Sequence, residues 1–283
     1  MKELIKALIA GTALLSLAGC NSTGSKSSDI VVSALGSIVE TTDDGTTDSI
    51  EDATAKFATD KDGNIKVTVS TDGDTDTTTF AASSANTTTE TSGEYTTYSS
   101  ENGTETTYLT ALGDTDTPEK GAAAFISVEN SESPNAPTFL AFRSEDGVTD
   151  SADMPTDGTA TYVGTLYGGS NEDGTVSNMT GTATVNVDFT NSSVAGTFDI
   201  DDNDTSITFT DGSISGSTYN VASTGITYGD ATIGTDSYVK GAFYGSDVGG
   251  TAGTFLVQGD VTDSETNETV SATAMGAFQA TKQ

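Results

Sequence analysis

The feature that most constrains the fold is a two-residue alternation of apolar and polar side chains, repeated along the C-terminal half of the chain from Gly158 to Lys282. Between Thr182 and Thr190 every second residue is apolar and the residues between them are polar. This alternation is typical of a strand with one buried and one solvated face. The other alternating segments are centred on Tyr162/Gly164/Leu166, Val194/Gly196/Phe198/Ile200, Ile207/Phe209, Tyr219/Val221, Val239/Gly241/Phe243, Phe255/Val257 and Val270/Ala272/Ala274/Gly276/Phe278.

Together these segments predict about eight strands, and about eight antiparallel strands joined by tight turns can close into a barrel that side chains just fill. Four mid-strand glycines share the apolar phase: Gly164, Gly196, Gly241 and Gly276. Glycine weakens a strand interior, so its repeated use indicates tight bends or close packing inside a narrow barrel. A membrane-spanning barrel is the alternative, but it would carry aromatic girdles at its rims. The chain lacks Trp, which argues against such girdles. A filled interior is favoured because one apolar phase contains Phe189, Phe198, Phe209, Phe243, Phe255 and Phe278.

The fold class we predict is all-β, with a small β domain at residues 29–150 followed by an eight-stranded antiparallel β-barrel domain at residues 151–283. In the first domain, alternation and turn clusters predict strands. Asn102-Gly103 predicts a hairpin turn between two of them, and Ser49 with Asp52 before Ala53 predicts the start of a short helix. The predicted strands cover Ile65/Val67/Val69, Thr77–Ala81, Tyr95–Ser99, Thr106–Thr110, Ala123–Glu129 and Thr138–Phe142, and Ile30 to Leu35 could begin another.

Residues 1–19 have the form of a secretory signal peptide, with Lys2 and Lys6 before a short apolar run. The following Leu17-Ala18-Gly19-Cys20 resembles the lipobox of bacterial lipoproteins. That resemblance implies lipidation of Cys20 by several acyl chains, palmitate among them, and anchoring in the outer membrane, since Asn21 follows the cysteine. Residues 20–28 are then a lipidated, flexible tether.

Composition excludes several classes of function. The net charge of −32 disfavours nucleic acid, because phosphate contacts need clustered Lys and Arg. The acidity fits either general solubility in a salty medium, which we favour because the carboxylates are spread along the chain, or a patch for a basic partner. The chain has no His and a single Cys, so it lacks the residues of a Ser-His-Asp triad or a thiolate cluster. We expect no enzyme activity, no catalytic residues and no cofactor.

Metal and haem sites can be assembled only in part. Acidic segments at Asp60–Asn64, Asp72–Asp76 and Asp199–Asp204 resemble pieces of calcium loops, yet none completes the twelve-residue pattern, and Asp and Gly also favour turns. Without His, haem would need Tyr or Met as axial ligand. The candidates are Tyr228, Tyr238, Tyr244 and Met275, and packing is the favoured role for each. We therefore expect no metal site.

The C-terminal half resembles the β-barrel domain of transferrin-binding protein B and related surface lipoproteins, including haem- and haemoglobin-scavenging members and factor H binding protein. The resemblance rests on the order of the segments Gly158–Gly164, Val187–Phe189, Val194–Phe198, Gly241–Gly245, Ala252–Phe255 and Gly276–Phe278. It implies a lipid-anchored chain in which a handle-like domain precedes an eight-stranded barrel. It also implies binding of a soluble ligand and an outer-membrane receptor as partner. Family binding residues lie on variable loops, so no ligand-binding residue is transferred.

From these observations we expect a cell-surface lipoprotein of the outer membrane that binds a soluble protein or haem-type ligand, such as an iron or haem carrier. The alternative is a structural or adhesive acidic surface lipoprotein without cargo, whose function would depend on calcium. In the ligand-binding hypothesis, loops on a rigid scaffold would bind the ligand.

Overall fold

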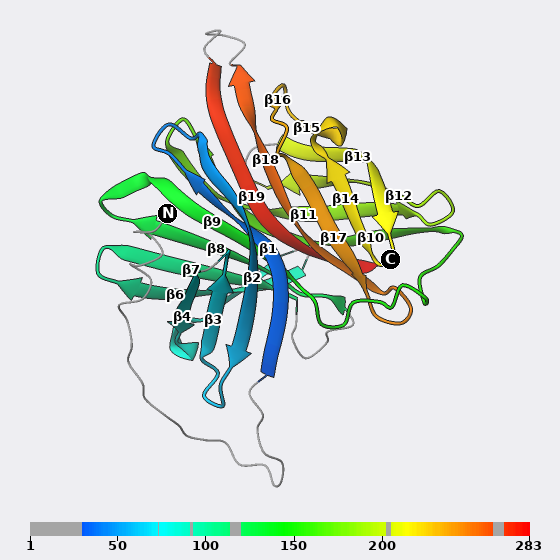
Figure 1. The fold of residues 1–283 in the computed structure, drawn as a ribbon, viewed down its shortest axis with the longest axis horizontal. Helices are drawn as coiled ribbons and strands as arrows, with labels where there is room; N and C mark the ends of the chain where they lie inside the picture. The colour runs from blue at the N-terminus through cyan, green and yellow to red at the C-terminus, as the bar shows by residue number, and fades with distance from the viewer. Residues whose placement is uncertain (1–29, 73, 91–92, 114–119, 202–204, 263–268) are drawn as a thin grey trace.

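The computed structural model describes residues 30–72, 74–90, 93–113, 120–201, 205–262 and 269–283. These residues form two antiparallel sheets that lie side by side (Figure 1). The first sheet contains strands β1 to β9 in the order β4-β3-β2-β1-β9-β8-β7-β6-β5, and the second contains β10 to β19. Within the described residues, no helix is long and apolar enough to cross a membrane.

The second sheet closes into a barrel. Its strands follow the order β12-β11-β10-β19-β18-β17-β14-β13, and β13 pairs again with β12 to complete the ring. The eight-stranded antiparallel barrel predicted from the sequence is confirmed, and each alternating segment is one of its strands. Two short strands add to it, β15 (Ile226–Tyr228) on β13 and β16 (Thr232–Ile233) on β18. The barrel strands are β10 (Thr159–Glu172), β11 (Thr175–Asp188), β12 (Ser193–Ile200), β13 (Thr205–Ser215), β14 (Thr218–Ala222), β17 (Tyr238–Tyr244), β18 (Gly250–Thr262) and β19 (Thr269–Lys282).

The apolar phase of these strands points into the barrel, where aromatic rings pack together. The ring of Phe198 lies 5.0 Å from that of Phe209, 5.1 Å from that of Phe255 and 4.9 Å from that of Phe278, measured between centroids. All four side chains are fully buried. Burying a phenylalanine stabilises a fold by about 1.5–3 kcal/mol, and each well-placed aromatic pair adds about 0.5–1.5 kcal/mol. The barrel is therefore filled by side chains, as expected from the sequence.

Glycines on the inward face make room for these rings. Gly241 lies opposite Tyr219 in the β14–β17 register, and a Cβ atom added to Gly241 would be 2.3 Å from Cζ of Tyr219. Gly164 instead faces backbone, because a Cβ atom there would be 2.0 Å from the carbonyl oxygen of Gln279. The close packing predicted for these glycines is thus confirmed. Four glycine–aromatic pairs face each other across neighbouring strands: Gly196–Phe209, Gly241–Tyr219, Gly253–Phe278 and Gly276–Phe255.

The first sheet confirms the strands predicted for the N-terminal region. The turn after Asn102 joins β6 to β7, with Gly103 at a φ of 66°. The helix predicted from Ser49 is wrong, because Ser49 lies in β2, which pairs with β1. The strands are β1 (Ile30–Thr41), β2 (Thr47–Thr59), β3 (Ile65–Ser70), β4 (Thr75–Phe80), β5 (Asn86–Glu90), β6 (Gly93–Asn102), β7 (Glu105–Leu112), β8 (Ala123–Asn130) and β9 (Ser133–Ser144).

The reason for this error lies in the pairing of β2. Ala53 and Ala55 are buried while Thr54 and Lys56 are exposed, which is the two-residue period of a strand. Hydrogen-bonded neighbours on both sides, β1 and β3, satisfy the backbone of this segment. A local capping signal is worth only about 1 kcal/mol, so the long-range pairing overrides it.

The first sheet curls so that β4 contacts β6, and its concave face encloses a separate apolar core. One carboxylate lies on this face. Asp76, on β4, is 9% exposed, and its Oδ1 atom has no hydrogen-bond partner among the described residues. The core residues are Ala34, Ala53, Ala55, Val67, Phe80, Leu109, Ala124, Ile126, Val128, Leu140 and Phe142.

The opposite face of the first sheet packs on the outside of the barrel. Phe125 and Phe139 from the first sheet share one buried cluster with Leu256 and Met275 from the barrel. Asn171 of β10 is fully buried here, and its Nδ2 atom donates to Thr41 Oγ1 at 3.0 Å, to the Thr42 carbonyl at 3.1 Å and to the Asn135 carbonyl at 2.7 Å. Apolar burial and buried hydrogen bonds together fix the first sheet against the barrel.

Gly241→Ala tests the glycine–aromatic packing. The three atoms nearest the added Cβ would be Cζ, Oη and Cε1 of Tyr219, so the substitution should lower the free energy of unfolding by about 1–3 kcal/mol through overpacking. In a Tyr219→Leu background these atoms are absent, and the added methyl should cost far less. Urea unfolding of the two single variants, the double variant and the parent measures this coupling. An equal cost of Gly241→Ala in both backgrounds would refute the packing described.

Asp76→Asn is expected to raise the free energy of unfolding at neutral pH. Burial, and then the nearby Asp74 carboxylate, raise the pKa of Asp76 above its ordinary value of 3.8 in the folded protein. The folded state therefore holds this proton more tightly than the unfolded state, and ionisation at higher pH weakens the fold. The gain from the substitution should be present at neutral pH and should shrink as the pH falls through the raised pKa towards 3.8. Urea unfolding across this range, with the exposed Asp157→Asn as control, measures it. A gain independent of pH would contradict the assignment.

Candidate functional site

A large concave surface lies between the first sheet and the outside of the barrel. It is a cleft of about 640 Å³. It continues into a second hollow of about 510 Å³ that shares Ser37, Asp52 and Lys240 with it. The cleft is lined by Leu35, Gly36, Ser37, Asp52, Ala53, Thr54, Ser70, Thr71, Asp72, Arg143, Ser213, Ser215, Thr218, Tyr219, Asn220, Lys240, Gly241 and Thr254.

The alternation of side chains along the strands directs two basic residues into this cleft. Lys240 lies on β17 between Val239 and Gly241, which face the barrel interior, so its side chain points outward. Arg143 on β9 has the same phase as Phe139 and Ala141, which face the barrel. Both cations therefore point into the space between the two sheets.

The cleft combines positive charge with hydrogen-bonding groups in a strongly acidic chain. Lys240 Nζ lies 4.2 Å from the centroid of the Tyr238 ring, an interaction worth about 0.5–1 kcal/mol at an exposed site. Arg143 donates from Nη1 to the Ser144 carbonyl at 3.3 Å and also interacts with the Tyr244 hydroxyl, so only part of its five N–H donors is left for a ligand. The Asp52 and Asp72 carboxylates lie in the same lining. Such a mixed lining can recognise a polar ligand surface that carries acidic groups opposite the two cations.

Three of the four candidate haem ligands lie in the contact between the sheets. Tyr238, Tyr244 and Met275 all belong to the buried cluster there. The Tyr244 hydroxyl donates to the Ser144 carbonyl at 2.5 Å, and burial raises the pKa of this tyrosine to about 12. A phenolate ligand would need this proton removed and this hydrogen bond broken. Tyr228, the fourth candidate, is partly buried against the barrel core, and burial raises its pKa as well.

The first of the calcium-like segments is a turn between β2 and β3. The Asp60 carboxylate accepts from the backbone N–H of Asp62 at 2.9 Å, from that of Asn64 at 3.0 Å and from Asn64 Nδ2 at 3.0 Å. These bonds lower the pKa of Asp60 and use its oxygens within the turn. Asp199 and Asp201 precede residues 202–204, which lie outside the described part. Across the described ranges no group of three or more Asp, Glu, Cys or His is placed to hold a metal ion.

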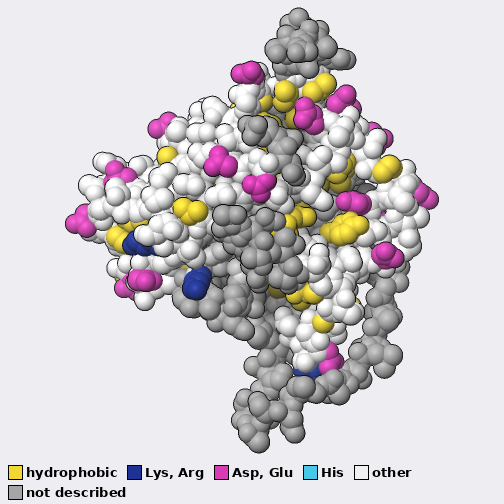
Figure 2. Space-filling view, turned by 180° about the vertical axis from the view of Figure 1, so that it is seen from behind, with side chains coloured by type: hydrophobic (Ala, Val, Ile, Leu, Met, Phe, Trp, Pro, Cys, Tyr) yellow, Lys and Arg dark blue, Asp and Glu magenta, His cyan; other side chains and the backbone are white. Residues whose placement is uncertain are grey.

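The acidic side chains are scattered rather than gathered. Figure 2 shows Asp and Glu side chains at separate points over one face of the molecule, with few Lys or Arg between them. This distribution is the one expected if the charge serves solubility. Cys20, the predicted lipidation site, and the preceding signal sequence lie outside the described residues.

Sequence reasoning missed the residues of the cleft. Arg143 and Lys240 come from segments about a hundred residues apart, and each appears in the sequence as an isolated polar residue on a strand. The scarcity of cations is the one signal that could have singled them out, because the whole chain has 10 Lys and Arg against 42 Asp and Glu. Placing them together requires the docking of the two sheets.

Comparison with known proteins gives one match to a protein family. Residues 154–282 match the family model described as C-lobe and N-lobe beta barrels of Tf-binding protein B. No curated protein matches the sequence.

Three solved structures are among those similar to this chain. A transferrin-binding protein B double mutant from Haemophilus parasuis is 11% identical, with 91% of this chain and 76% of that chain covered and a TM-score of 0.43. The haemoglobin receptor HpuA from Kingella denitrificans, solved with human haemoglobin, is 13% identical, with coverages of 92% and 89% and a TM-score of 0.42. Transferrin-binding protein B from Neisseria meningitidis is 13% identical, with coverages of 91% and 77% and a TM-score of 0.36.

The family match spans β10 to β19, which are the strands that close the ring. It covers the segments on which the sequence resemblance rests. Residues 154–282 therefore form a β-barrel of the transferrin-binding protein B type.

Proposed function

We propose that the chain is a lipoprotein of the outer membrane that captures a soluble ligand in the cleft between its handle-like first sheet and its barrel. The observation that carries the proposal is the cleft itself, about 640 Å³ in volume and lined by both sheets. Its walls are rigid, because the sheets are fixed to each other by a buried apolar cluster. A preformed concave surface limits the ordering cost of binding.

Two observations support a class of ligand: the lining of the cleft and the family that the barrel matches. Two cations lie in this lining beside the carboxylates of Asp52 and Asp72, so the cleft is less acidic than the rest of a chain of net charge −32 and can accept acidic groups of a ligand opposite Lys240 and Arg143. The related structures are a haemoglobin receptor and transferrin-binding proteins. We therefore propose an iron or haem carrier protein as the ligand, bound without covalent chemistry. Cys20 would carry the lipid anchor, at the end of the tether of residues 20–28, and an outer-membrane receptor would take the cargo.

Lys240→Glu tests this function. The chain from Asn21 to Gln283 is immobilised and exposed separately to haemoglobin, iron-loaded transferrin and haemin. We expect saturable capture of one carrier, weakened about tenfold or more by the charge reversal, with a smaller effect at high salt. Surface plasmon resonance measures both quantities.

Lys66→Glu is the matched control, since Lys66 is exposed on β3 and does not line the cleft. It makes the same change of net charge and should leave capture within about twofold, because a distant exposed charge is screened. Equal losses in the two variants would reject the cleft as the binding site. Capture of none of the three probes would reject carrier binding, and a melting shift on adding calcium would then support the adhesive alternative.

A further inference from the structure

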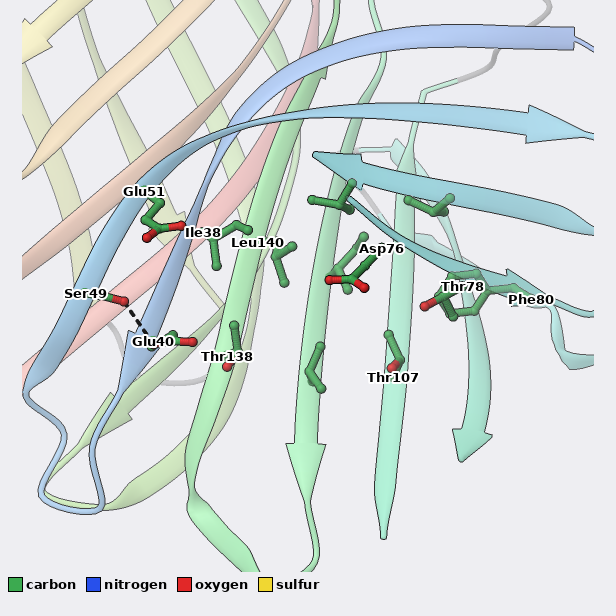
Figure 3. A pocket seen from close by; sticks show the side chains of 14 residues that line it. Ile38, Glu40, Ser49, Glu51, Asp76, Thr78, Phe80, Thr107, Thr138 and Leu140 are labelled. Carbon is green, nitrogen blue, oxygen red and sulfur yellow. Dashed lines mark hydrogen bonds between the residues drawn. The ribbon is translucent and has the colours of Figure 1, made fainter. Parts of the chain in front are cut away.

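A second hollow lies within the first sheet, away from the cleft. It is a cavity of about 80 Å³ on the concave face, between β1, β2, β3 and β4 on one side and β7, β8 and β9 on the other. Figure 3 shows the labelled side chains directed into one space from these strands. It is lined by Ile38, Glu40, Ser49, Glu51, Val67, Val69, Asp76, Thr78, Phe80, Thr107, Ile126, Val128, Thr138 and Leu140.

The walls of this hollow are apolar and buried. Val67 is 2% exposed, Ile126 4% and Leu140 7%, and Phe80 is fully buried. An apolar cavity of about 150 Å³ can hold benzene. A cavity of about 80 Å³ is roughly half that size, so on the same scale it holds about three carbons of an alkyl chain.

One polar group in this apolar lining has no partner. Asp76 Oδ1 is buried and makes no hydrogen bond within the described structure, and Figure 3 places Asp76 among the residues that surround the space. An unpaired carboxylate in an apolar setting is costly, and a ligand that supplies a donor removes that cost. The burial of this oxygen therefore points to a donor that enters from outside the chain.

The charge of the lining indicates which kind of hydrogen-bond donor would bind to Asp76. Glu40 and Glu51 line the hollow together with Asp76, and the lining contains no Lys or Arg. Glu40 Oε2 already accepts from Ser49 Oγ at 3.0 Å (Figure 3), so that part of the rim is held in place. Hydrogen bonds between an ammonium group and a carboxylate are about twice as strong as neutral ones. A cation therefore fits this lining better than a hydroxyl group.

We propose that the hollow binds an alkylammonium group, with about three carbons of its chain against Val67, Ile126 and Leu140 and its ammonium nitrogen donating to Asp76. Lysine has this chemistry, with four methylene groups and a terminal ammonium. The group could thus belong to a lysine side chain of a protein partner or to a free alkylamine. This site is independent of the cleft and of the proposed capture of a carrier.

The test uses n-butylammonium chloride on the chain from Asn21 to Gln283, which contains every described residue. Methyl resonances of Val67, Ile126 and Leu140 should shift saturably in NMR spectra. Neutral n-butanol should bind about tenfold more weakly or worse, because it lacks the charge. Asp76→Asn should weaken n-butylammonium binding about tenfold or more, and Asp157→Asn, which changes an exposed carboxylate that does not line the hollow, should leave it within about twofold.

A second measurement uses the parent protein, so it does not depend on whether the Asp76→Asn variant folds. The carboxyl carbon of Asp76, followed by NMR against pH, should titrate at a lower pH when n-butylammonium is present and at an unchanged pH with n-butanol. If Nα-acetyl-lysine amide displaces n-butylammonium, the site is assigned to a lysine side chain of a partner. If n-butylammonium binds and Nα-acetyl-lysine amide does not displace it, the site is assigned to free alkylamines. Equal binding of alcohol and amine, or no binding of the amine, would overturn the proposal. Lys240→Glu, in the cleft, should leave these results unchanged.

Discussion

The pairing of β12 with β13 closes the barrel, and the rest of the structure depends on that closure. An open eight-stranded sheet would expose two edges with unpaired N–H and C=O groups, whereas a closed ring has none. Closure also creates the enclosed interior that the rings of Phe198, Phe209, Phe255 and Phe278 fill. A register shift between Val194 and Gly196 in β12 lets the seam form while the ring curves.

A barrel this narrow can hold aromatic rings in its interior only because glycines lie opposite the rings. In each glycine–aromatic pair the aromatic side chain covers the backbone of its partner, so the space that a Cβ atom would take is given to the ring. Each glycine weakens its own strand, and the buried ring area offsets that loss. The outside of the filled barrel then offers a firm surface to the first sheet. Docking of the first sheet on that surface produces the cleft, so the candidate site is a consequence of barrel packing.

Most of the fold could be predicted from the sequence because the strands are long, one-sided and close together along the chain. The apolar phase of β11, for example, needs no knowledge of its neighbours to be recognised. The start at Ser49 was misread as helical, since a capping pattern is local and strand pairing with β1 is not. The backbone conformation of Val248, which is buried with a φ of 55°, is also not predictable from the local sequence. Nothing local marks a β-branched residue for that conformation, and the Tyr162 hydroxyl, which donates to its carbonyl at 2.8 Å, comes from 86 residues away.

The candidate site could be predicted far less well than the fold. Lys240 and Arg143 meet only when two sheets dock, and the hollow around Asp76 forms only when β4 curls towards the opposite half of its sheet. Both depend on contacts between segments far apart in sequence, which alternation cannot report. The neighbours of Asp76 in sequence place it in a segment that resembles a piece of a calcium loop. Its structural neighbours are apolar, and they give it a different chemistry.

Amide hydrogen exchange across the seam between β12 and β13 tests the closed barrel most directly. If the ring is closed, the amides of Phe198 and Ile207, which are register partners, should be protected as strongly as those of β11 in the middle of the sheet. Exchange at both positions at the rate of a solvent-exposed strand edge would show an open sheet and would contradict the account.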